Sequence, residues 1–120
     1  MENKKIIDKT KNSTYNICTD IGCFQWNIAK NTANIEKHGV SFEEALTAFD
    51  DISALYITDN VHSEAEQRYF VIGMSEKLNI LVVSHCIRGN DDIIRIISAR
   101  KAEKAEVGIY EQYSNRITRK

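Results

Sequence analysis

The stretch Val40-Ser41-Phe42-Glu43-Glu44-Ala45-Leu46-Thr47-Ala48-Phe49 carries the clearest local signal in the chain, the start of an amphipathic helix. Ser41 and Glu44 form a capping box, in which the serine hydroxyl accepts from the Glu44 amide and the glutamate can reach back to the cap. Val40 and Ala45 occupy the two positions of a hydrophobic staple. The apolar residues of this helix fall on one face, at Phe42, Ala45, Leu46 and Phe49. We therefore expect a helix that starts after Ser41 and ends near residues 50–51.

Upstream of this helix the sequence predicts a strand, another helix and an N-terminal extension. Residues 24–26 alternate apolar and polar side chains, which is typical of a short strand. Asn27 can cap a helix that runs to about His38, and Gly39 stands where a left-handed C-terminal cap belongs. Residues 1–23 are rich in Lys, Asn, Thr and Asp and show no hydrophobic period. We expect this segment to be flexible or loosely docked.

Downstream of the helix the pattern changes to strands. The candidates cover residues 54–58, 68–74, 80–87 and 93–99, with a polar loop at 59–67, a turn at 75–79 and a hairpin turn at 89–92. A helical pattern returns over residues 101–114. Because consecutive strands joined by short turns pair antiparallel, we expect a meander. With helices on one face, this predicts a two-layer α+β domain over residues 24–114, with two N-terminal helices, a C-terminal helix and a tail at 115–120.

Size and composition fit one soluble domain. The chain has 120 residues, of which 42% are hydrophobic and 28% charged, and both fractions are ordinary for a globular protein. No apolar run approaches a membrane-spanning length and no export signal is evident, so we expect a cytoplasmic protein with no membrane partner. The net charge is −1, yet residues 68–120 carry ten Lys+Arg and six Asp+Glu. That half can present a positive face on a nearly neutral protein.

The cysteines and histidines predict neither a disulfide framework nor a metal centre. The three cysteines are an odd number without an export signal, and we expect free thiols at Cys18, Cys23 and Cys86. The histidines are widely spaced, at His38, His62 and His85. Residues 62–66 could chelate a metal, but a solvated acidic loop would carry the same side chains. We expect no metal and no cofactor.

Two strand residues interrupt apolar rows near a shared hairpin end. Strand alternation places His85 in a row with Leu81 and Val83, and it places Arg95 in a row between Ile93 and Ile97. An arginine is costly to bury unpaired, so Arg95 must reach solvent, a carboxylate or a bound anion. Each residue also has a plain interpretation. Arg95 could be an exposed arginine on an open sheet face, and His85 a hydrogen-bonded structural residue.

Further arginines stand at strand ends, where Arg68 opens one strand, Arg88 closes another and Arg100 follows the last. In a meander, several of these guanidiniums could gather on one surface. The planar fork of arginine suits phosphate. Together with Tyr110, such a cluster could bind an RNA backbone and stack a base.

A series of ordered motifs resembles the BrnT family of ribonuclease toxins. The first are Phe24-Gln25-Trp26, Asn34-Ile35-Glu36-Lys37-His38-Gly39-Val40-Ser41-Phe42-Glu43-Glu44-Ala45 and Phe49-Asp50-Asp51. His62-Ser63-Glu64 with Glu66, Arg68-Tyr69, Ile72-Gly73-Met74 and Leu81-Val82-Val83 with His85 follow. Arg95-Ile96-Ile97-Ser98-Ala99-Arg100-Lys101-Ala102 and Tyr110-Glu111 close the series. The resemblance covers about ninety residues, and ordered motifs together are far more specific than any one of them.

The resemblance implies a RelE-like fold and a toxin that cleaves RNA without a metal. It also implies a BrnA-type antitoxin that neutralises the toxin, in a complex that represses its own promoter with the antitoxin contacting DNA. The expected chemistry is attack of a ribose 2′-OH on the neighbouring phosphorus. We assign acid–base catalysis to His85 and the phosphate clamp to Arg68, Arg95 and Arg100. The substrate contacts expected beside them are Lys37, His38, Arg88 and Tyr110, although His38 could simply cap its helix.

One departure from the family keeps an alternative open. The final helix of the family is commonly rich in arginine, whereas Glu103, Ala105, Glu106 and Val107 stand in this one. The alternative is a catalytically decayed BrnT-like module that binds a protein partner. A plain nucleic-acid-binding module is a third interpretation.

Overall fold

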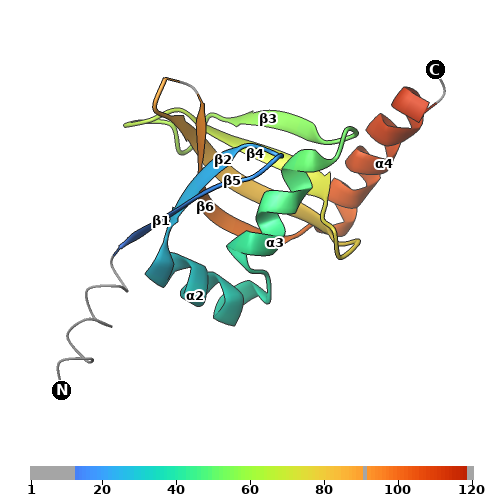
Figure 1. Cartoon of the computed structure of the whole chain (residues 1–120). Helices are drawn as coiled ribbons and strands as arrows, with labels where there is room; N and C mark the ends of the chain where they lie inside the picture. The colour runs from blue at the N-terminus through green and yellow to red at the C-terminus, as the bar shows by residue number, and fades with distance from the viewer. Residues whose placement is uncertain (1–12, 91, 119–120) are drawn as a thin grey trace.

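The computed structural model describes residues 13–90 and 92–118, with side chains up to residue 114. An N-terminal hairpin, β1 (Thr14–Cys18) and β2 (Cys23–Asn27), leads into α2 (Ile28–His38), α3 (Phe42–Thr47) and the short 3-10 helix η1 (Ala48–Asp50). The strands β3 (Leu55–Asp59), β4 (Arg68–Met74), β5 (Ile80–Arg88) and β6 (Ile93–Lys101) follow, and α4 (Lys104–Thr118) ends the described chain (Figure 1). The protein is thus α+β, as the sequence predicts.

The sheet has six strands in the order β1-β2-β6-β5-β4-β3. From β3 to β6 the chain forms the expected antiparallel meander. The sheet is nevertheless not antiparallel throughout, because β2 pairs parallel with β6. Helices α2 and α3 lie between β2 and the meander in the chain, so the rule for strands joined by short turns does not apply to this pair.

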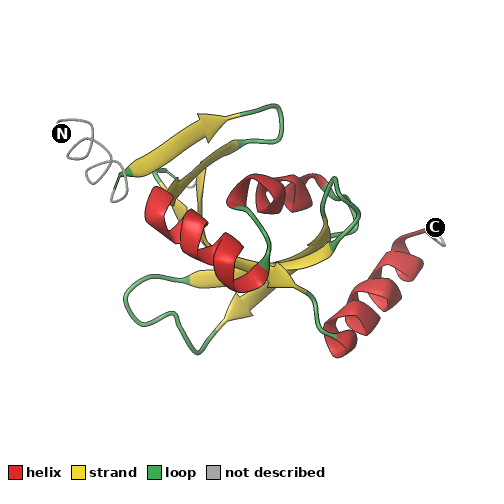
Figure 2. Cartoon of the chain, turned by 90° about the horizontal axis from the view of Figure 1, so that it is seen from below, coloured by secondary structure: helices red, strands yellow, loops and turns green. Residues whose placement is uncertain are grey.

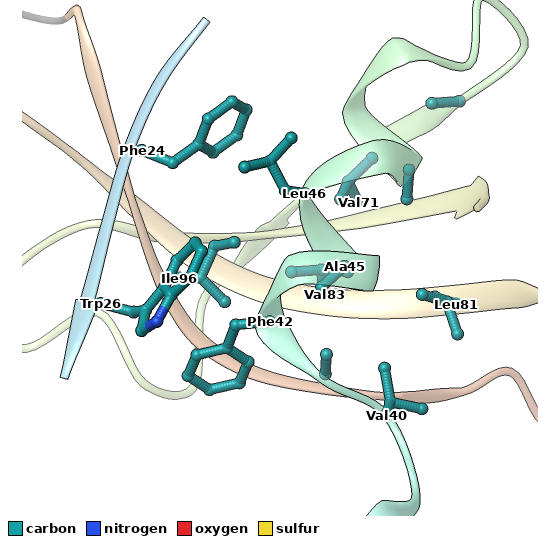
Figure 3. Packing of buried hydrophobic residues seen from close by; sticks show 13 residues of the cluster. Phe24, Trp26, Val40, Phe42, Ala45, Leu46, Val71, Leu81, Val83 and Ile96 are labelled. Carbon is teal, nitrogen blue, oxygen red and sulfur yellow. The ribbon is translucent and has the colours of Figure 1, made fainter. Parts of the chain in front are cut away.

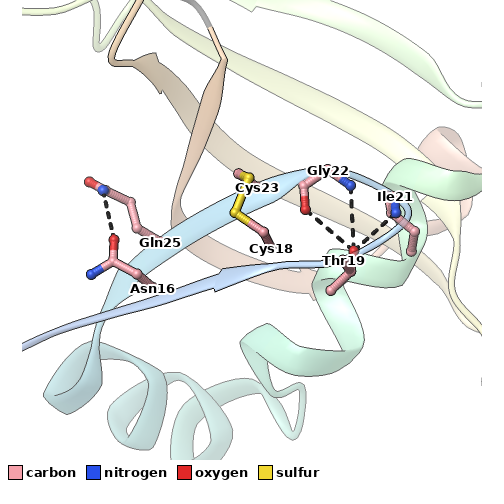
Figure 4. Close-up of a disulfide and its surroundings, with 7 residues drawn as sticks. All are labelled: Asn16, Cys18, Thr19, Ile21, Gly22, Cys23 and Gln25. Carbon is pink, nitrogen blue, oxygen red and sulfur yellow. Dashed lines mark hydrogen bonds between the residues drawn. A yellow bond between two sulfur atoms is a disulfide. The ribbon is translucent and has the colours of Figure 1, made fainter.

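The N-terminal hairpin corrects two expectations about residues 1–23. Residues 1–12 lie outside the described residues, but residues 14–18 form β1, which pairs with β2 along its whole length. The register sets Cys18 opposite Cys23, and their sulfurs form a disulfide. Figure 4 shows this bond beside the turn, where Thr19 Oγ1 accepts from the Ile21 amide at 3.0 Å. The absence of a strand period in this segment left no basis for predicting that these thiols pair.

We predict that reducing this disulfide destabilises the protein. A cross-link that closes a loop from Cys18 to Cys23 restricts the unfolded chain and contributes about 2 kcal/mol in the chain-entropy account. Urea unfolding with and without a thiol reductant measures the difference. A Cys18→Ser/Cys23→Ser variant is the control, and it should be insensitive to reductant because the remaining cysteine, Cys86, is buried and free. Equal unfolding free energies for the oxidised and reduced wild type would contradict the prediction.

Helix α2 has the predicted ends. Asn27 Oδ1 accepts from the Lys30 amide at 2.9 Å. Gly39 has φ 70° and donates its N–H to the Ile35 carbonyl, so the left-handed cap is confirmed. The helix is fastened to the sheet by buried Asn34, which donates to the Ala99 carbonyl at 2.7 Å and accepts from the Ala99 amide at 3.1 Å. These bonds hold α2 against β6.

Helix α3 has only half of the predicted capping box. Ser41 Oγ accepts from the Glu44 amide at 3.0 Å, as expected. Glu44 does not reach back to the cap. It is buried and accepts from Ser75 Oγ at 2.6 Å and from Asn79 Nδ2 at 2.8 Å. The carboxylate therefore fastens α3 to the turn between β4 and β5, a long-range role that local spacing cannot indicate.

The main core lies between the sheet and the two helices α2 and α3. Figure 3 shows its aromatic side chains, which include Phe24 and Trp26 from β2 and Phe42 from α3. All three are at most 1% exposed. Val71, Leu81, Val83 and Ile96 are among the residues that the sheet contributes to this cluster. Gly73 permits this packing, because a Cβ there would lie 2.7 Å from the Ala48 carbonyl oxygen of η1.

A smaller core covers the opposite face of the sheet. Tyr110 of α4 packs there with Ile72 and Val82, whose neighbours along the strands, Val71 and Val83, face the main core. The two-layer prediction placed all helices on one face of the sheet, and this part of it is wrong, because α4 covers the face opposite to α2 and α3. Figure 2 shows α4 standing apart from the other two helices. The backbone of α4 is helical to Thr118, which includes most of the expected tail. None of the described helices is long and apolar enough to cross a membrane.

Candidate active site on the arginine face

Four arginines lie on the face of the sheet that α4 partly covers. Arg68 of β4 and Arg95 of β6 are both cross-strand partners of Cys86 in β5. Arg88 lies two residues beyond Cys86, and Arg100 is the partner of Val82. Cross-strand partners and residues two apart share a face of a sheet. We call this surface, bearing Arg68, Arg88, Arg95 and Arg100, the arginine face.

Two of these guanidiniums are neutralised by carboxylates. Arg88 binds Glu66 through two bonds of 2.7 and 3.0 Å. Arg100 binds Glu106 of α4 through two bonds of 2.8 Å. The guanidinium hydrogen bonds hold the pKa of both glutamates below its usual value. Arg88 and Arg100 therefore carry less free positive charge than their positions in the sequence suggest.

Arg68 and Arg95 are not paired in this way. Within the described residues, neither has a carboxylate at ion-pair distance. Arg95 Nη1 donates to Gln25 Oε1 at 3.0 Å, and Gln25 in turn donates to Asn16 Oδ1 at 3.2 Å. The N-terminal hairpin thus orients Arg95. Both guanidiniums are half-buried and keep donors for an anion on the sheet surface.

His85 lies on the opposite face, away from the arginines. It follows Val83 on the core side and is only 2% exposed. Its Nδ1 lies 3.1 Å from the Val83 carbonyl oxygen, and its ring contacts Phe49 at a centroid distance of 4.9 Å and Tyr69 at 5.9 Å. Burial lowers the pKa of His85, which the bond to Val83 only partly opposes. An RNA strand on the arginine face cannot reach this ring.

We predict that His85 makes the protein sensitive to mild acid. Above the unfolded-state pKa, near 6.5, the imidazole is neutral in both states. Below it, the unfolded chain takes up a proton that the folded chain resists, so the unfolding free energy falls by up to about 1.4 kcal/mol per pH unit. Urea unfolding of the wild type and of His85→Gln between pH 7 and 5 measures this, with a flatter curve expected for the variant. Parallel curves would contradict the prediction.

The other expected substrate contacts are not gathered with the arginines. Lys37 and His38 lie in the last turn of α2, which packs on the core side of the sheet. Tyr110 is on the α4 side but is 6% exposed. Its hydroxyl donates to Asp51 Oδ2 at 2.5 Å, and burial and this carboxylate raise its pKa. Its ring is packed in the smaller core, so it offers no open platform for a base.

A pocket beside Arg68 holds residues to which the sequence analysis gave no catalytic role. Its volume is about 340 Å³, and its lining residues are Val61, His62, Glu64, Ala65, Glu66 and Arg68. His62 Nδ1 lies 3.0 Å from Oδ2 of Asp59, whose carboxylate is buried. The sequence motifs include His62 in the resemblance to the family and as a possible metal ligand, without a catalytic role. An Asp and a His three residues apart at the start of a polar loop were the available signal. In the described part of the chain no three ligand-type side chains gather to hold a metal.

Comparison with known proteins agrees with this fold. The described sheet and helices are similar to the 1.1 Å crystal structure of the Brucella abortus ribonuclease toxin, BrnT, with a TM-score of 0.50 and 27% sequence identity. The match covers 66% of this chain and 94% of that one. The family model described as the ribonuclease toxin, BrnT, of type II toxin–antitoxin systems matches residues 26–106. A search of curated proteins finds no match.

The class that the fold and these matches define is that of small ribonuclease toxins. The chain belongs to the BrnT family of ribonuclease toxins of type II toxin–antitoxin systems. The resemblance seen in the sequence motifs is thereby confirmed.

Proposed function

We propose that this chain is a metal-independent endoribonuclease that binds RNA phosphates on the arginine face. The observation that carries the proposal is the placement of Arg68 and Arg95 on β4 and β6, the two strands that flank Cys86 of β5. Neither arginine has a carboxylate partner among the described residues. Two guanidiniums fixed on one side of a sheet suit the oxygens of a phosphodiester.

The reaction proposed is internal transesterification. The ribose 2′-oxygen forms a bond to phosphorus, the bond from phosphorus to the 5′-oxygen breaks, and the proton lost from the 2′-OH is balanced by one gained at the leaving oxygen. Negative charge grows on the phosphoryl oxygens, where the guanidiniums of Arg68 and Arg95 donate hydrogen bonds. Arg88 and Arg100 would contribute only if RNA displaced Glu66 and Glu106. The products are a 2′,3′-cyclic phosphate and a 5′-hydroxyl.

The family assignment supports two further parts of the proposal. A type II toxin has a protein antitoxin, and we assign this chain a BrnA-type antitoxin that neutralises it and contacts DNA on behalf of the complex. The same proposal includes that the arrangement of sheet and helices is similar to the fold of RelE-type toxins. Co-expression of a BrnA-type antitoxin should relieve the growth arrest that we expect the toxin to cause.

One observation favours the second candidate, a catalytically decayed module. Glu66 and Glu106 neutralise half of the arginine face. Glu106 also accepts from the Glu103 amide at 2.8 Å, so it caps the first turn of α4 and is held in place against Arg100. A decayed protein would keep the antitoxin-binding surface and lose RNA cleavage.

Cleavage of RNA by the purified protein in excess EDTA separates these candidates. We expect fragments with 2′,3′-cyclic phosphate and 5′-hydroxyl ends. The matched control is the same RNA with 2′-deoxyribose at the cleaved positions, which should remain intact. Loss of cleavage in EDTA, or fragments with 3′-hydroxyl ends, would contradict the proposed mechanism. Intact RNA under all conditions, with antitoxin binding retained, would support the decayed module.

A further inference from the structure

We propose that His62, positioned by Asp59, transfers the proton from the attacking 2′-OH when RNA is cleaved on the arginine face. This inference deepens the proposed function and rests on it. His62 lies in the loop between β3 and β4. That loop is at the same end of the sheet as the turn between β5 and β6 (Figure 1).

The Asp59 carboxylate fixes the orientation of the imidazole. Asp59 is 5% exposed, and its Oδ2 lies 3.0 Å from His62 Nδ1. Its Oδ1 accepts from the amides of Val61 at 3.1 Å and His62 at 3.2 Å. A carboxylate at Nδ1 selects the tautomer that carries its proton there, which leaves Nε2 free to accept one. The side chain of His62 is 63% exposed, so that nitrogen is open to a ligand.

Asp59 is ionised over the range in which the reaction would run. Burial acts to raise the pKa of Asp59, but the hydrogen bonds from the His62 ring and from the two loop amides outweigh it and lower the pKa below the usual value. An ionised carboxylate can hold the Nδ1 proton of the ring in a hydrogen bond while Nε2 acts on the substrate.

The loop also places His62 next to the proposed phosphate clamp. His62 and Arg68 line the same pocket, of about 340 Å³. Asp59 and Arg68 are cross-strand partners, so both side chains lie on the arginine face. Ser63 closes the loop between them, since its hydroxyl donates to the Asp59 carbonyl and accepts from the Arg68 amide at 2.9 Å. An RNA phosphate at Arg68 would therefore have the His62 ring beside it.

The other histidines do not have this combination. His85 is 2% exposed and lies on the core side of the sheet. His38 ends α2, which packs on that same side. His62 is thus the histidine whose ring is exposed, held by a carboxylate and next to an arginine without a carboxylate partner among the described residues.

The protons and bonds of the proposed step can be followed from the substrate to His62 and solvent. The 2′-OH proton moves to His62 Nε2 as the bond from the 2′-oxygen to phosphorus forms. The bond from phosphorus to the 5′-oxygen breaks, and the leaving oxygen takes a proton from water. The imidazolium then returns its proton to solvent, which restores the neutral ring for the next cycle.

The test compares His62→Ala with the wild type for cleavage of a defined RNA across pH 5 to 8. We expect kcat/KM to fall about 10²–10³-fold, within the range of a lost general base. The rise of the wild-type rate with pH on its acid side should be absent in the variant, and added imidazole should restore part of the activity. Binding of a 2′-deoxy oligonucleotide of the same sequence should change less than threefold.

Two variants complete the design. Asp59→Asn keeps an oxygen for the two loop amides but removes the charge and the tautomer control, so we expect a loss of at least about 10-fold and a displaced acid limb. Asn60→Ala changes an exposed residue of the same loop and should leave cleavage unchanged.

The possible results separate this inference from the function on which it rests. Wild-type cleavage with an unchanged His62→Ala rate and pH profile would overturn the role of His62 and leave the ribonuclease standing. Equal losses of cleavage and of oligonucleotide binding in His62→Ala would also overturn it, because the residue would then be a binding contact. Absence of cleavage by the wild type would overturn both proposals.

Discussion

Arg68→Ala and Arg95→Ala are each expected to reduce the rate of RNA cleavage by about 10²–10³-fold, the size expected when one preorganised donor to a developing charge is removed. Both side chains extend from the middle strands of a well-packed sheet, on the side away from the main core. Their loss should therefore remove charge without removing the fold. In a bacterium that expresses the protein from an inducible promoter, either substitution should relieve growth arrest.

Two control variants test whether the effect depends on the shape of the arginine side chain and on its position on the sheet. Arg68→Lys keeps the positive charge but not the planar fork, so an intermediate loss is expected. Lys77→Ala removes an exposed cation in the turn between β4 and β5, at the other end of the sheet, and should leave cleavage unchanged. Urea unfolding of each variant checks that the fold is intact. Full activity in the Arg68→Ala/Arg95→Ala double variant would refute the arginine face as the active site.

Trp26→Ala is expected to cause the largest loss of stability, about 3–5 kcal/mol. The indole is 1% exposed and lies between Tyr15 of β1, at a centroid distance of 5.1 Å, and Phe42 of α3, at 6.0 Å. It therefore joins the N-terminal hairpin to the main core. A domain of this size has about 5–15 kcal/mol of stability in total, so the variant would retain only a small part of it.

Urea unfolding at constant pH measures this effect. Ile52→Ala is the matched control, because its side chain is 89% exposed and the expected change is within about 0.5 kcal/mol. A loss below about 1 kcal/mol in Trp26→Ala would mean that β2 does not pack against α3 as described. The result also bears on the site, since the neighbouring residue Gln25 donates to Asn16 and accepts from Arg95.

Local signals predicted most of the fold. Asn27 and Ser41 each accept from the backbone amide three residues further along the chain, and such bonds depend only on nearby residues. The meander strands likewise follow from period-two rows and turn residues. The features that sequence reasoning missed are set by distant partners. The parallel pairing of β2 with β6 and the docking of Tyr110 on the far face both require knowledge of which segments meet. The Cys18–Cys23 bond is local, but it depends on the register of a hairpin that the sequence does not signal by a strand period.

In the candidate site, too, local features could be predicted from the sequence, whereas contacts between separate segments could not. Alternation correctly put His85 in the row of Val83 but could not say that this row faces the core. The register skips Ile97 where His85 pairs with Ile96, and this bulge decides which β6 residues join Arg95 on its face. Nor could the sequence show that Arg88 and Arg100 are paired with glutamates. His62 and Asp59 both fell in the expected polar loop at 59–67, and nothing in the sequence showed that their side chains are hydrogen-bonded to each other.

NMR can locate bound RNA on the protein and so test directly whether the arginine face is the RNA-binding site. The isotope-labelled protein is titrated with a short oligonucleotide that carries 2′-deoxyribose at the cleaved position and so cannot react. We expect the guanidinium signals of Arg68 and Arg95 and the ring signals of His62 to shift together and to saturate at one oligonucleotide concentration. Shifts confined to α2, around Lys37 and His38, with the arginine face unaffected, would contradict this expectation.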